Sequence, residues 1–131
     1  MPATLRQLCR PFDGDRANTL ATLTVRAAAL DLDLVLVGAF ARDVWLCHLL
    51  DIDPPRKTLD MDFGVAVADW SQLEHLRNDL IACGFMPDAA PEHPERLTSP
   101  TGVNIDLLPF GGVTDPNDGS ITWLRDGVTM S

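Results

Sequence analysis

The 131-residue sequence has little positive charge and no long apolar run. Ten lysines and arginines stand against nineteen aspartates and glutamates, and the net charge is −9. A surface with this balance does not favour nucleic acid through counterion release, so RNA or DNA binding would need a local basic patch, a bound metal or another part of the protein. The absence of an apolar stretch of about 18 residues excludes a membrane-spanning helix. The N-terminal segment MPATLRQLCRPFDGD also lacks the apolar core of a signal peptide.

Cysteine is scarce as well. Cys9, Cys47 and Cys83 are odd in number and form no CxxC pair, which favours reduced thiols in a cytoplasmic protein over a disulfide framework. Each is also typical of a small buried apolar position. Histidine gives no catalytic triad: we expect His75 on an exposed helix surface, and His93, beside two glutamates, is open to metal binding or to an ordinary loop position.

The length predicts a single domain, residues 1–131, with a hydrophobic core. Apolar residues at helical spacing predict helices over residues 15–30, 39–50 and 69–83. Apolar or alternating stretches predict strands over residues 32–37, 59–67, 96–98, 103–108, 121–124 and 128–130. The inner face of the second helix is predicted to contain Phe40, Val44, Cys47 and Leu50. The buried stripe of the third helix is predicted to contain Leu73, Leu76, Leu80 and Ile81.

Two aspartates share one face of the strand predicted over residues 59–67, LDMDFGVAV. Successive strand residues point to opposite sides, so Asp60 and Asp62 point the same way while the alternate apolar side chains face the core. Two carboxylates at that distance repel each other, and a divalent cation is the usual reason to hold them together. Hard oxygen ligands and few protein contacts suit Mg²⁺. The alternative is a solvated polar face that binds no ion.

A third acid, Asp106, interrupts the apolar stretch NIDLLPF. An acid in such a position is costly unless it is paired or bound to an ion, and this makes Asp106 a third candidate ligand.

Gly38 separates the strand predicted over residues 32–37 from the helix that follows. Such a junction brings backbone N–H groups and a positive helix end together, which suits phosphate, and glycine lets a ligand approach the backbone. The alternative is a plain strand-to-helix turn. Later in the chain, the loop 51–58 brings Arg56, Lys57 and Thr58 up to the aspartate strand. Its two cations could bind triphosphate oxygens or neutralise the aspartates.

Taken in order, these features resemble the nucleotidyltransferase superfamily of the polymerase-beta type. The segments GAFARDV (38–44), RKTLDMDFGVAV (56–67) and VNIDLLPFGG (103–112) look like bacterial nucleotidyltransferases grouped with AbiE-type toxins of toxin–antitoxin systems. The resemblance implies an α/β (α+β) fold, with a mixed, twisted sheet of about five strands and helices mainly on one face. It also implies two Mg²⁺ ions when nucleotide is bound.

The resemblance assigns roles to individual residues. It implies that Asp60, Asp62 and Asp106 are the catalytic, metal-holding acids. It implies nucleotide-phosphate contacts at Gly38, Ala39, Arg42, Arg56 and Thr58, with Asp43 orienting Arg42 or capping its helix. The turn departs from the family pattern, because Gly38-Ala39-Phe40 stands where Gly-Gly or Gly-Ser is usual. Arg42 could then replace the missing serine hydroxyl.

The implied function is transfer of a nucleoside monophosphate from a nucleoside triphosphate to the hydroxyl of an acceptor, which could be tRNA, a protein or a small molecule. A toxin role would add an antitoxin protein as partner. Relatives continue into a helical C-terminal region, so we expect an N-terminal domain or a naturally minimal protein. A catalytically inactive nucleotide- or partner-binding module is the main alternative, and a metal-dependent phosphohydrolase is a third.

Overall fold

The computed structural model describes residues 14–44, 49–51, 60–89, 93–122 and 129–130. The elements in chain order are α1 (Gly14–Ala29), β1 (Asp33–Val37), α2 (Gly38–Asp43), β2 (Met61–Val67), α3 (Trp70–Ala82), β3 (Met86–Pro87), β4 (Arg96–Thr98), β5 (Asn104–Gly111), β6 (Ile121–Thr122) and β7 (Thr129–Met130). The first and third predicted helices agree to within two residues at each end. For the second, the structure gives α-helix over Gly38–Asp43, and residues 45–48 of the predicted span lie outside the described part of the chain.

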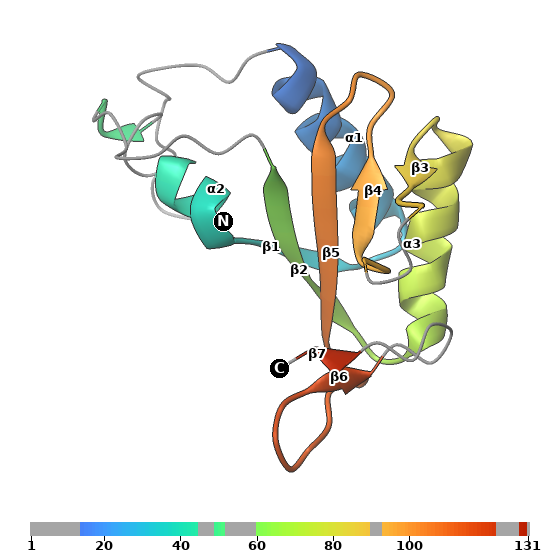
Figure 1. The fold of residues 1–131 in the computed structure, drawn as a ribbon. Helices are drawn as coiled ribbons and strands as arrows, with labels where there is room; N and C mark the ends of the chain where they lie inside the picture. The colour runs from blue at the N-terminus through green and yellow to red at the C-terminus, as the bar shows by residue number, and fades with distance from the viewer. Residues whose placement is uncertain (1–13, 45–48, 52–59, 90–92, 123–128, 131) are drawn as a thin grey trace.

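The main sheet has five strands in the order β1-β2-β5-β4-β3. The central pair, β2 and β5, is parallel, and the other neighbours are antiparallel. This confirms the mixed five-stranded sheet. The short pair β6 and β7 forms a separate two-stranded sheet, which lies beyond the lower end of β5 in Figure 1.

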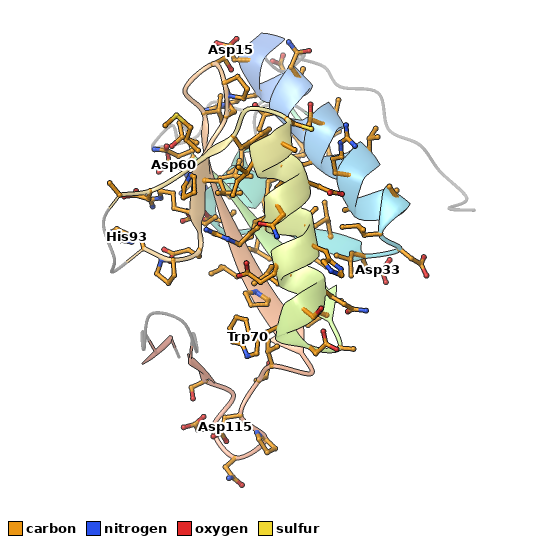
Figure 2. The ribbon with its side chains drawn as sticks, turned by 90° about the vertical axis from the view of Figure 1, so that its right-hand side faces the viewer. Asp15, Asp33, Asp60, Trp70, His93 and Asp115 are labelled. Atoms are coloured by element: carbon orange, nitrogen blue, oxygen red, sulfur yellow. The ribbon has the colours of Figure 1, made fainter. Side chains whose placement is uncertain are left out.

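Helices α1 and α3 lie side by side on one face of this sheet, as Figure 2 shows, in agreement with the predicted arrangement. Their apolar faces meet the alternate residues of the central strands. The buried core contains Leu23, Ala27, Leu32, Met61, Phe63, Val65, Val67, Leu73, Leu76, Leu80, Phe85, Leu97, Ile105 and Leu107. None of the helices in the described ranges has the length and apolarity needed to cross a membrane.

Two predicted core positions are wrong. Ile81 is 38% exposed because it follows Leu80 by one residue, which rotates its side chain about 100° away from the buried stripe. Leu50 is 47% exposed because it lies in a turn that continues into Asp51, whose φ is +59°, and no longer on a helix face.

Capping contacts define both ends of α3. The backbone N–H of Gln72 donates to the Asp69 carboxylate at 3.1 Å, which satisfies one of the free donors of the first turn. At the other end Gly84 adopts φ +99°, and the chain turns so that the N–H of Phe85 donates to the carbonyl of Leu80 at 3.0 Å. The turn carries Phe85 into the core and so fixes α3 on the sheet.

The opposite side of the sheet, here named the carboxylate face, carries the even-numbered residues of β2, β5 and β4. Asp62 and Asp106 belong to it, and so does Gly64, over which the exposed ring of Phe110 packs. The exposed side chain of Val35 on β1 adjoins them. The face is therefore polar around the two acids and apolar further along the strands.

Candidate functional site

Asp62 and Asp106 stand directly opposite each other on the adjacent parallel strands β2 and β5. Residues in register across neighbouring strands share a face, and the strands are about 4.8 Å apart. The structure thus brings together two of the three predicted acids from positions 44 residues apart in the sequence.

The electrostatics of Asp62 reflect this crowding. Burial raises the pKa of Asp62 above its ordinary value, and the negative charge of Asp106 and a hydrogen bond with it raise the pKa further. The charge of Asp60 acts in the same direction, whereas Arg96 opposes the shift. Two carboxyl groups in contact need a proton or a cation between them, because desolvation and like charge both disfavour two ionised forms.

Asp60 lies one residue before β2 and is partly buried. Figure 2 shows it on the opposite side of the molecule from Asp33. It also borders a cavity of about 390 Å³ that Asp15, Arg16 and the hairpin residues 101–104 help to line. Within the described ranges, no three His, Cys, Asp or Glu side chains are grouped so that they could hold a metal ion. The role of Asp60 as a third ligand therefore stays a prediction.

Arg96, which the sequence analysis did not select, completes the row of charged residues. On β4 it pairs in register with Asp106. Its Nε donates to Asp106 Oδ1 at 2.9 Å, and its Nη2 donates to Oδ2 at 3.3 Å. The hydrogen bond with Asp106 raises the pKa of Arg96. The predicted strands 96–98 and 103–108 were the available signal, because antiparallel pairing across the short connection between them places Arg96 opposite Asp106.

Gly38 lies against Asp62, on the side of β2 that faces β1. Its neighbour Val37 pairs in register with Asp62, and Gly38 itself has φ +71°. A Cβ at this position would lie 2.5 Å from Asp62 Oδ2. Both the left-handed backbone and the lack of space therefore require glycine here, and the turn backbone lies next to the carboxylate of Asp62.

The other predicted phosphate-binding residues are placed less fully. Ala39 lies in the first turn of α2, directly after Gly38. Arg42 lies in the last turn of α2 and is exposed. Arg56 and Thr58, with Lys57 between them, lie outside the described residues. Their assignment to phosphate stays a prediction.

Asp62 and Asp106 fit Mg²⁺ as a donor set. Both offer hard oxygen ligands on one face of the sheet, and magnesium is commonly held by one or two carboxylates with water and substrate phosphates as further ligands. The mutual repulsion that raises the pKa of Asp62 is the kind of strain that a bound cation relieves.

Comparison with known proteins agrees with this architecture. No protein-family model matches the sequence, and no curated protein matches it. Among solved structures, the chain is similar to the Thermotoga maritima CCA-adding enzyme complexed with tRNA, with a TM-score of 0.50 and 22% identity. That match covers 75% of this chain and 22% of the enzyme, so the chain spans about a fifth of the length of its relative.

Two further structures are similar at TM-scores of 0.48. They are a CCA-adding enzyme in complex with CTP, of which 21% is covered, and a cytoplasmic RNA terminal U-transferase, of which 30% is covered. Each is 24% identical to this chain over 75% of its length. The similarity to the Thermotoga enzyme shows that this chain has the fold of a nucleotidyltransferase.

Proposed function

We propose that this chain is the catalytic domain of a metal-dependent nucleotidyltransferase. It would move a nucleoside monophosphate from a nucleoside triphosphate to an acceptor hydroxyl. The observation that carries the proposal is the contact between the half-buried carboxylates of Asp62 and Asp106 on one sheet face, with the Gly38 turn packed against Asp62. The nucleotidyltransferase fold of the chain supports it.

The residues of this site have distinct tasks. Asp62 and Asp106, joined by Asp60, would hold magnesium, with two ions expected when nucleotide is bound. When bound, the metal neutralises the triphosphate and stabilises the attacking and leaving oxygens of an in-line displacement. The turn backbone at Gly38, with Ala39 beside it, would contact the phosphate oxygens. Asp106 lies at the centre of the row and could accept the proton of the acceptor hydroxyl.

The basic residues would position the triphosphate. Arg42 follows the Gly38 turn on α2, and Arg56 and Thr58 precede the aspartate strand in the sequence. Positioning and charge neutralisation supply most of the catalysis in reactions of this class. Because the whole chain carries a net charge of −9, these cations and the metal must offset repulsion of the nucleotide.

The finer assignment to AbiE-type toxins, with an antitoxin partner and a cytoplasmic location, is part of the proposal. Its support is the resemblance of the segments 38–44, 56–67 and 103–112 together with the cysteine pattern. The acceptor could be tRNA, a protein or a small molecule. Labelling a lysate with the protein and an α-labelled triphosphate, followed by mass spectrometry of the labelled species, would identify it.

A second function has one observation in its favour. Both carboxylate oxygens of Asp106 are engaged by Arg96, which would suit a module that binds nucleotide without transferring it. Calorimetry with Mg²⁺ and each triphosphate, run beside transfer of α-labelled nucleotide, separates the two functions. Binding with transfer supports the enzyme, and binding without transfer supports the module.

Two aspartates on the same sheet provide a test variant, Asp62→Ala, and its control, Asp33→Ala. Asp62→Ala should abolish transfer while the fold persists. Asp33→Ala should retain transfer, since Asp33 is exposed at the far end of β1 and pairs with Ala66, four residues along β2 from Asp62. Undiminished transfer by Asp62→Ala would refute the assignment of the site.

A further inference from the structure

We infer that the guanidinium of Arg96 neutralises Asp106 while no metal is bound. Arg96 then competes with a divalent cation for the Asp106 carboxylate. The site then binds a free cation weakly until a nucleotide brings further ligands. The inference rests on the proposed role of Asp62 and Asp106 as metal ligands. It adds a function for a residue on a third strand.

The geometry of the pair makes the competition direct. The guanidinium reaches both oxygens of Asp106, at 2.9 Å from Nε and 3.3 Å from Nη2. This two-point contact is a strong form of charge-assisted hydrogen bond and orients the carboxylate as well as neutralising it. A cation that approaches Asp106 from the carboxylate face must share or replace these contacts and must approach a positive charge.

Burial keeps the competition effective. The Arg96 side chain is 25% exposed and that of Asp106 is 16% exposed, so solvent and salt screen the pair less than they screen a surface ion pair. The strand register holds Arg96 in place, because β4 pairs with β5 through Arg96, Leu97 and Thr98, and Leu97 is fully buried. The register therefore keeps the backbone of Arg96 beside Asp106, with the guanidinium within reach of that carboxylate.

A merely structural cross-strand ion pair predicts a different behaviour. In that case removal of Arg96 would lower the stability of the fold and leave the affinity for a cation unchanged or reduced, since Asp106 would lose its orientation. Competition predicts that removal of Arg96 raises the affinity for the cation, because the Asp106 carboxylate beside Asp62 is then fully available. Metal affinity in the absence of nucleotide thus separates the two roles, and it requires no catalytic activity.

The first test measures Mn²⁺ binding to the full chain without nucleotide. Electron paramagnetic resonance of the free ion gives the amount bound. We expect Arg96→Gln to bind Mn²⁺ about tenfold more tightly than the wild type, a typical size for coupling between two sites. Arg26→Gln removes one positive charge from α1, on the helical side of the sheet. Its Mn²⁺ affinity should stay within about twofold of the wild type, because solvent and salt screen a distant surface charge. Asp106→Asn should weaken binding.

Each other outcome contradicts the inference in its own way. If Arg96→Gln binds Mn²⁺ no more tightly than the wild type while Asp106→Asn weakens binding, Arg96 does not compete and the proposed function stands. If Arg26→Gln gains as much as Arg96→Gln, the effect is general charge and not competition for Asp106. If no variant and no wild type binds Mn²⁺ and no transfer is seen, the inference and the proposed function fail together.

A second measurement uses the wild type alone and so does not depend on how well a variant folds. The Nε–H group of Arg96 donates to Asp106, so its ¹H–¹⁵N resonance reports this hydrogen bond. Titration with Mg²⁺ should move that resonance along the same saturation curve as the backbone amides around Asp62. An Arg96 resonance that stays in place while those amides saturate would overturn the inference.

Discussion

Gly38 and Asp62 are packed so closely that a single methyl group on Gly38 would lie 2.5 Å from the carboxylate Oδ2 of Asp62. Gly38→Ala should therefore displace Asp62 and also strain the backbone, whose φ is +71°. The strain alone should lower the free energy of unfolding by about 1–2 kcal/mol, and the displacement should weaken Mn²⁺ binding as well. Urea denaturation and Mn²⁺ titration measure the two effects.

Gly119→Ala is the matched control for this prediction. Gly119 has φ +75°, but a Cβ there would meet nothing within 4 Å. Figure 2 shows the neighbouring Asp115 at the opposite end of the molecule from Asp60. The control should lose similar stability and keep its metal affinity. Equal metal affinity in both variants would show that the Gly38 turn does not shape the site.

Asp62→Asn should stabilise the metal-free protein at about pH 7. Burial and Asp106 raise the pKa of Asp62 above its ordinary value of 3.8, so the folded state binds the Asp62 proton more tightly than the unfolded chain does. The stability from this group is then present below about pH 4 and is lost as the pH rises through the raised pKa. The melting temperature of Asp62→Asn minus that of the wild type should grow over this range. A gap that narrows with rising pH would contradict the shift.

Asp106→Asn should have the opposite effect on stability. It leaves the guanidinium of Arg96, 25% exposed, without its carboxylate, and loss of hydrogen bonds to a charged group costs about 1–3 kcal/mol. Relief of the repulsion with Asp62 offsets part of this loss. Urea denaturation at about pH 7 should place Asp106→Asn below the wild type and Asp62→Asn above it. If both variants change the free energy of unfolding in the same direction, the ion pair with Arg96 does not determine the effect of Asp106 on stability.

Leu76→Ala should lower the free energy of unfolding by about 2–5 kcal/mol, because Leu76 is fully buried between α3 and the sheet and its removal leaves a cavity. Ile81→Ala is the control on the same helix, with a similar loss of volume from a side chain that is 38% exposed. It should cost about 1 kcal/mol or less. Comparable losses in the two variants would place Ile81 in the core after all.

Much of the fold and part of the candidate site could be predicted from local patterns. Strand alternation predicted that Asp62 faces away from the core, and the acid inside an apolar stretch identified Asp106. The sequence shows on which side of its strand Asp106 lies, but it does not show that Asp106 pairs with Asp62. That register is a parallel pairing between β2 and β5, which are separated by a helix and a hairpin, and it depends on how α3 packs on the sheet.

The features that could not be predicted from the sequence also have physical reasons. Arg96 lies on a three-residue strand with weak alternation, and only hairpin pairing reveals its contact with Asp106. The apolar character of Ile81 and Leu50 suggested burial, but Ile81 points away from the buried stripe of α3 and Leu50 lies in a turn. The arrangement of Asp60 depends on side-chain torsions just before β2, which no sequence pattern encodes.

The most direct test of the account is where a metal–nucleotide complex binds. Mn²⁺ with a nucleoside triphosphate should broaden backbone amide resonances around Gly38, Asp62 and Asp106, and Asp62→Ala should remove the broadening. Resonances around Asp115, at the far end of the molecule in Figure 2, should stay sharp. Broadening centred anywhere else, or broadening that survives Asp62→Ala, would contradict the claim that these carboxylates are the reaction site.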